Sequence, residues 1–111
     1  MAQVIHPQVI DATGEIVGEG AGPTYGVTIH GYLFSETGGT SAAYVDMYSG
    51  ADAGSKGTVT APSAAGTHIG RIQIPAGTTV SLLDHVGVYH KNGVYMKAGG
   101  AGTVLGQVFR S

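Results

Sequence analysis

The five histidines of the sequence are the side chains best suited to hold a metal ion. No two of them have the i, i+4 spacing of a helical ligand pair, and the chain has no cysteine. A zinc site built from Asp84, His85 and His90 is conceivable, because these residues lie close together in sequence. His85 and His90 are an odd number of residues apart, however, so on one regular strand they point to opposite faces. We therefore expect no metal and no cofactor, and we interpret the histidines as surface residues that hydrogen-bond locally.

The seven acidic residues offer little for acid–base catalysis. Most of them fall in predicted turns or near the N-terminus, and only Asp46 lies within a predicted strand. Paired carboxylates in a cleft would indicate glycoside hydrolysis, but a small chain with so many turns leaves little room for a cleft. The Gly-rich runs at 18–22 and 99–102 lack the helix and the Lys-Ser/Thr pair of a phosphate loop. We expect that the protein is not an enzyme.

The tyrosines are the remaining side chains that could form a binding surface. The chain has six of them and no tryptophan. Tyr32, Tyr44 and Tyr48 fall on the predicted outer faces of two strands. A tyrosine ring is rigid and amphipathic, which suits a protein interface. The same rings could instead form a second packed layer, or stack against sugars, and the sequence leaves these alternatives open.

The elements that carry these residues are predicted to be strands. Gly accounts for 20 of 111 residues, which disfavours helices and favours turns. Residues 24–34 alternate with a period of two, which predicts a strand with Val27, Ile29 and Leu33 inward. Residues 43–49 alternate in the same way, and further strands are expected at 68–74, 79–83 and 103–109. Asn-Gly at 92–93 between the strands 86–90 and 94–97 predicts a β-hairpin.

Eight or nine short strands at this spacing predict an all-β fold, an antiparallel β-sandwich that is jelly-roll-like. Residues 23–111 are assigned to this sandwich domain and residues 1–22 to an extended N-terminal arm. The arm carries apolar residues in pairs, which we take as candidate interface residues: Val4, Ile5, Val9, Ile10, Ile16 and Val17. Its two alternatives are an edge strand on the domain's own sheet and a strand added to a neighbouring subunit.

The charge content limits the possible partners. Charged residues make up 11% of the chain, against about 25% in an average domain. An exterior with so few charges is easier to understand if other chains cover part of it, which favours oligomerisation or docking. The five Lys and Arg residues are scattered, so we expect no nucleic acid as a partner. No apolar run approaches the roughly 20 residues that span a bilayer, and no secretion signal is apparent, so we expect no membrane partner.

Five segments together resemble a known family: GPTYGVTI at 22–29, YVDMYSG at 44–50, GTTVSL at 77–82, NGVYMK at 92–97 and GTVLGQVF at 102–109. In this order they resemble the small β-sandwich proteins that decorate or cement the heads of tailed bacteriophages. The resemblance covers roughly residues 22–109 and leaves out the arm.

The resemblance implies a structural virion protein that binds the outer surface of the capsid and stabilises it. Its partner would be the major capsid protein, and it would form a homo-oligomer, with a trimer favoured. It would be made in the host cytoplasm and end on the capsid exterior. If the arm provides the docking, deletion of residues 1–20 leaves a folded body that no longer holds to capsids. The alternatives are a carbohydrate-binding or adhesion module that uses the three tyrosines, and a tail or connector subunit.

Overall fold

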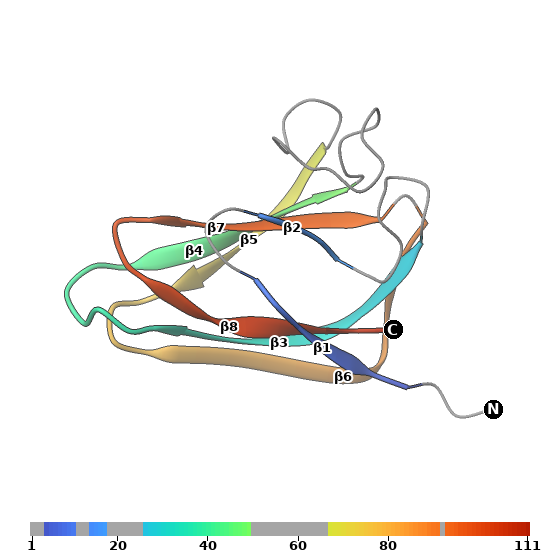
Figure 1. The fold of residues 1–111 in the computed structure, drawn as a ribbon, viewed down its shortest axis with the longest axis horizontal. Coiled ribbons are helices and arrows are strands. Elements are labelled where there is room, and N and C mark those ends of the chain that lie inside the picture. The colour runs from blue at the N-terminus through green and yellow to red at the C-terminus, as the bar shows by residue number, and fades with distance from the viewer. Residues whose placement is uncertain (1–3, 11–13, 18–25, 50–66, 92) are drawn as a thin grey trace.

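The computed structural model describes residues 4–10, 14–17, 26–49, 67–91 and 93–111, and these residues form two antiparallel sheets without a helix (Figure 1). The strands are β1 (His6–Val9), β2 (Glu15–Val17), β3 (Val27–Glu36), β4 (Ala43–Ser49), β5 (Thr67–Ile74), β6 (Thr79–His90), β7 (Val94–Gly100) and β8 (Val104–Arg110). One sheet has the strand order β1-β8-β3-β6 and the other has the order β2-β7-β4-β5. The predicted all-β sandwich is therefore confirmed.

The strand pairing is that of a jelly roll. β1 pairs with β8, β2 with β7, β3 with β6 and β4 with β5, always antiparallel. These are the pairs of one long hairpin that is folded around a core. Successive pairs alternate between the two sheets, and Figure 1 shows the sheets stacked as two layers.

The core lies between the two layers. Phe34 and Val108 enter it from the β1-β8-β3-β6 sheet, and Val45, Ile74 and Met96 enter it from the other sheet. All five side chains are fully buried. Burial of a large apolar side chain contributes roughly 1.5–3 kcal/mol, so these residues hold the layers together.

The prediction of which β3 side chains point inward is confirmed at the start of the strand and is wrong beyond its middle. Val27 is buried and Ile29 packs against the core, but Leu33 is 39% exposed and its neighbour Phe34 is completely buried. The pairing register shifts between Ile29 and Gly31, which marks a β-bulge. Because side chains alternate along a strand, one extra residue moves every later side chain to the opposite face.

A hydrogen-bonded histidine holds this bulge. The strand β6 places four residues, 84–87, opposite the single residue His30. The buried imidazole donates from Nδ1 to the backbone carbonyl of Asp84 at 2.9 Å and accepts at Nε2 from the hydroxyl of Ser111 at 2.8 Å. The next residue is Gly31, with φ at +156°, where any side chain would collide with the backbone of β6. The bulge therefore depends on contacts far apart in the sequence.

The described parts of the predicted arm belong instead to the sandwich. β1 pairs with β8 over four residues, and β2 pairs with β7 over three. Ile10 and Val17, two of the candidate interface residues, are buried in the core. Of the two alternatives for this segment, the structure has the edge strand on the domain's own sheets, because apolar side chains here complete the core.

The prediction of a hairpin around Asn92-Gly93 is wrong. Asn92 itself lies outside the described residues. A turn is present, since the Gly93 N–H donates to the His90 carbonyl at 3.1 Å and Gly93 has φ at +80°. However, β6 and β7 lie in different sheets and do not pair. The turn therefore carries the chain from one layer to the other. The two strands predicted at 79–83 and 86–90 form the single strand β6.

One buried carboxylate joins three connections at one end of the sandwich. Glu36, the last residue of β3, accepts hydrogen bonds from the backbone N–H groups of Gly38 and Gly39 at 2.7 Å, and of Gly77 and Thr103 at 2.9 Å. These donors lie in the β3–β4, β5–β6 and β7–β8 connections. The backbone N–H groups stabilise the ionised form, with Gly77 contributing most, and lower the pKa of Glu36 to about 2.

We predict that Glu36→Gln lowers the melting temperature at neutral pH. An amide has only one acceptor oxygen, and its NH₂ group would face backbone donors, so several hydrogen bonds are lost. Loss of even one hydrogen bond lowers the melting temperature of a domain of this size by roughly 4–8 °C. Circular dichroism melts of both proteins measure the difference.

The same substitution has a predicted pH dependence. Because the pKa of Glu36 is lowered in the folded state from 4.5 to about 2, its stabilisation is fully present above pH 4.5 and is lost as the pH falls towards 2. The gap in melting temperature between wild type and Glu36→Gln should therefore narrow across this pH range. A difference in melting temperature that stays constant down to about pH 2 would contradict the lowered pKa of Glu36.

We predict that deletion of residues 1–17 unfolds the domain, contrary to the expectation for a dispensable arm. The deletion removes β1, β2 and the buried Ile10 and Val17, and truncation of one buried Ile or Leu already costs about 2–5 kcal/mol. Loss of the cooperative thermal transition is the expected result. A truncated chain that melts at the wild-type temperature would restore the arm hypothesis.

Candidate functional site

The strand register places no charged residue on the outer side of the β1-β8-β3-β6 sheet, which we call the uncharged face. Pairing aligns Val9, Gln107, Leu33 and Ser81 in one row across the four strands. Because Leu33 is exposed, this row points away from the core. Alternation along each strand places the following residues on the same side: Pro7, Val9, Thr28, Leu33, Ser35, Thr79, Ser81, Leu83, Tyr89, Leu105, Gln107 and Phe109.

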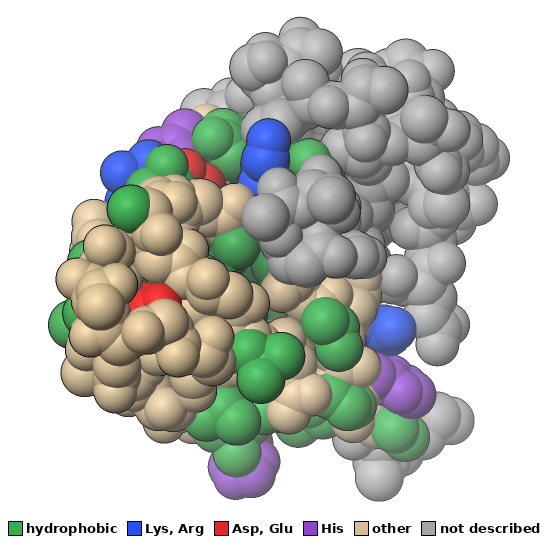
Figure 2. Space-filling view, turned by 60° about the vertical axis from the view of Figure 1, so that its left-hand side comes forward, with side chains coloured by type: hydrophobic (Ala, Val, Ile, Leu, Met, Phe, Trp, Pro, Cys, Tyr) green, Lys and Arg blue, Asp and Glu red, His purple; other side chains and the backbone are tan. Residues whose placement is uncertain are grey.

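Apolar side chains on the uncharged face are well exposed. Leu105 is 66% exposed, Tyr89 65% and Val9 62%. Among the residues that the register assigns to this face, none is Asp, Glu, Lys or Arg. Figure 2 shows green side chains along the lower border of the molecule, which in Figure 1 is the side of this sheet. Depletion of charge with retained aromatic and aliphatic side chains is typical of the centre of a protein interface.

Among the described strands, β6 forms one edge of the uncharged face. It is the last strand of its sheet, so one row of its backbone N–H and C=O groups has no strand partner within that sheet. Native edge strands are usually blunted by charges, prolines or bulges, and β6 has a bulge at residues 84–87. Of the 12 residues of β6, only Asp84 carries a charge, and Val86 is 81% exposed. This edge is suited to contact with another chain.

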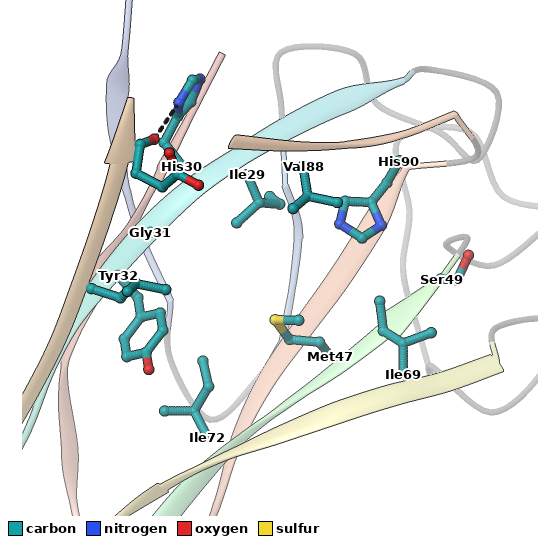
Figure 3. A pocket seen from close by; sticks show the side chains of 12 residues that line it. Ile29, His30, Gly31, Tyr32, Met47, Ser49, Ile69, Ile72, Val88 and His90 are labelled. Atoms are coloured by element: carbon teal, nitrogen blue, oxygen red, sulfur yellow. Dashed lines mark hydrogen bonds between the residues drawn. The ribbon is translucent and has the colours of Figure 1, made fainter. Parts of the chain in front are cut away.

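A cavity of about 410 Å³ opens beside β6, between the two sheets (Figure 3). It lies where β6 and β5, the last strands of their sheets, do not close over the interior. Its wall is mainly apolar, formed by Ile29, Tyr32, Met47, Ile69, Ile72, Leu82 and Val88 with His30, Gly31, Ser49, Asp84 and His90. Burial lowers the pKa of His90, which favours its neutral form. The cavity therefore adds apolar surface next to the uncharged face.

The outer side of the β2-β7-β4-β5 sheet is different, because charged side chains lie on it; we call it the polar face. The carboxylate of Asp46 accepts hydrogen bonds from Arg71 Nε at 2.7 Å and Nη2 at 3.0 Å, and from His68 Nε2 at 3.0 Å. The hydrogen bond from Arg71 is the largest cause that lowers the pKa of Asp46. The guanidinium also lies 3.7 Å from the ring centre of Tyr44.

Two of the three predicted tyrosines are on an outer face, as expected. Tyr44 and Tyr48 lie with Asp46 on the polar face, because β4 follows its predicted alternation up to a register shift near its end. Tyr32 instead lines the cavity between the sheets and stacks on Phe34, because the bulge reverses this part of β3. It is not available as an outer platform.

The six predicted arm residues are separated by the fold. Val4 and Val9 are exposed and Ile5 is half-buried, while Ile10 and Val17 lie in the core. The backbone of Ile16 pairs with β7, and its side chain lies outside the described ones. Sequence reasoning missed the outward residues of β3, β6 and β8. The signal that it overlooked is residues 79–90, which carry one charge and six apolar side chains.

Metal chemistry finds no support in the part of the chain that the structure describes. No group of three or more His, Asp or Glu side chains there is placed to hold a metal ion. The Asp84 carboxylate accepts a hydrogen bond from the Val86 N–H at 3.0 Å, and His90 lines the apolar cavity. The same residues contain no helix long and apolar enough to cross a membrane.

Comparison with known proteins leaves the function to be argued from these surfaces. No family model matches the chain, and no curated protein matches it. The chain is similar in structure to a solved protein chain, whose structure is described as "Bacillus endospore appendages form a novel family of disulfide-linked pili". It has 17% sequence identity and a TM-score of 0.47, and the match covers 96% of this chain and 80% of that chain. A similarity of this degree carries no argument about function.

Proposed function

We propose that this protein is a structural, non-catalytic subunit of a phage virion that binds the outside of the capsid as a decoration or cement protein. The observation that supports the proposal is the contrast between the two outer faces of the sandwich. The uncharged face has exposed Leu33, Leu83 and Leu105 and no charged residue assigned to it by register. The polar face carries Asp46, Arg71 and Lys97.

A sandwich with two such different faces is suited to lie flat on a protein surface. The uncharged face and the edge of β6 would be buried against the capsid lattice, and the polar face would remain in contact with water. Docking would remove the exposed Leu33, Leu83 and Leu105 side chains from water, which favours association. Because desolvation of charges opposes association, a face without charges loses little on docking.

Repetition over a shell explains how modest contacts can stabilise a capsid. Each subunit that binds the intact lattice, and not its separated parts, shifts the equilibrium towards the intact state. A homotrimer, which the family resemblance implies, would place three such faces on the lattice at once and raise the effective concentration of the second and third contacts. A tail or connector lattice would use the same surfaces, and the neighbouring genes distinguish the two locations.

The docking proposal predicts that a single positive charge on the uncharged face weakens capsid binding by at least tenfold, roughly 1.4 kcal/mol. Leu83→Lys and Leu105→Lys suit the test, because both side chains are more than half exposed and their replacement leaves the core intact. Gln73→Lys, an exposed position on β5 that faces the other side, adds the same charge as a control. Co-sedimentation with capsids assembled from the capsid protein encoded beside this chain measures binding.

Thermal melts of the three variants should coincide with that of the wild type, which separates docking from folding. If Leu83→Lys and Leu105→Lys bind capsids as tightly as Gln73→Lys does, the uncharged face is not the docking surface. A gene neighbourhood with no capsid gene, together with a wild-type protein that stays monomeric in light scattering, would contradict the virion assignment itself.

A further inference from the structure

The polar face contains a slot that the proposed docking leaves open to water. It has a volume of about 210 Å³ and is lined by Tyr44, Asp46, Tyr48, Lys97, Ala98 and Gly99. The first three residues come from β4 and the last three from the neighbouring strand β7, where Asp46 pairs with Lys97 and Tyr44 with Gly99. The slot is thus formed by rigid strands rather than by loops, which favours a precise binding geometry.

The three β4 side chains that line the slot are held by neighbours outside it. Arg71 donates two hydrogen bonds to Asp46 and stacks on the ring of Tyr44. Tyr48 contacts the ring of His68, with 5.2 Å between centroids, and the buried ring of Tyr95, with 6.1 Å between centroids. A site whose residues are fixed before a ligand arrives loses less side-chain entropy on binding.

Gly99 in β7 leaves room for the Tyr44 ring, which lines the slot. A Cβ atom at Gly99 would lie 2.9 Å from three atoms of the Tyr44 side chain, closer than real Cβ contacts allow. Any larger residue would therefore displace the tyrosine ring. By contrast, Gly70 on β5 has a single neighbouring atom at 4.0 Å, so a methyl group fits there without a shift. Gly99 and Gly70 form a matched pair for a test.

The chemistry of the slot points to a ligand with hydroxyl groups and one negative charge. The Asp46 Oδ2 atom accepts one hydrogen bond from Arg71, which leaves it with a further lone pair for a donor. A fully ionised phosphate supplies no such donor to Asp46. Arg71 and Lys97 provide two positive charges against one carboxylate, and Lys97 forms no ion pair with an acid among the described residues.

We propose that this slot binds a carboxylate-bearing sugar ring, of the uronic acid type. The ring lies between the Tyr44 and Tyr48 side chains, its hydroxyl groups donate to Asp46 and its carboxylate pairs with Lys97. One face of the Tyr44 ring is already covered by the guanidinium of Arg71, so recognition depends on hydrogen bonds and charge more than on stacking. The site is independent of capsid docking and lies on the opposite side of the sandwich.

Isothermal titration of the full chain with a galacturonic acid trisaccharide tests the proposal, and the neutral galactose trisaccharide serves as the control ligand. We expect millimolar or tighter binding of the acidic sugar, at least tenfold weaker binding of the neutral one, and a loss of affinity at high salt. Lys97→Gln should reduce affinity for the acidic sugar to that for the neutral sugar. Gly99→Ala should weaken binding at least tenfold, while Gly70→Ala binds like the wild type.

Each alternative result has a definite meaning. Absence of heat with either trisaccharide at millimolar concentration overturns the site. Equal binding of both sugars, or no effect of Lys97→Gln, overturns the assigned role of the carboxylate. Equal affinities of Gly99→Ala and Gly70→Ala would place the sugar elsewhere on the molecule. Because the titration needs no capsid, its failure leaves the docking proposal standing, and the reverse also holds.

Discussion

The Glu36 carboxylate is the constraint on which the arrangement of the two sheets depends. It binds backbone donors from three connections, which belong to strands of both layers, and so fixes the spacing of the layers at that end. The cavity lined by Ile29 and Val88 lies towards the other end of β3, where β5 and β6 do not close the interior. The sandwich is thus clamped at one end and open along one edge.

The few charges of the chain are distributed unequally between the two outer faces. For distinguishing these faces, this unequal distribution matters more than the low number of charges. Asp46, Arg71 and Lys97 lie together on the polar face, while the register assigns no charged residue to the uncharged face. Composition alone indicated a covered exterior but not which side. Strand order and register supply the side, because they determine which alternate residues share a face.

The sequence predicted what depends on local alternation, and failed where distant contacts decide. The fold class, the strand 43–49 and the outward direction of Tyr44 and Tyr48 follow from a period of two, and all are confirmed. The reversal of β3 was not predictable in this way, because the bulge depends on His30 and its hydrogen bond to Ser111, 81 residues away. For the same reason, the short apolar pairs near the N-terminus gave no sign that their partners are β7 and β8.

The position of β8 has a consequence for the order in which the sheets can form during synthesis. This strand lies between β1 and β3, so the β1-β8-β3-β6 sheet cannot form until residues 104–110 have left the ribosome. Until then the uncharged face is incomplete, and β1 lacks the strand with which it pairs. Translation itself thereby delays completion of this sheet: a nascent chain that lacks β8 does not yet carry the full uncharged face.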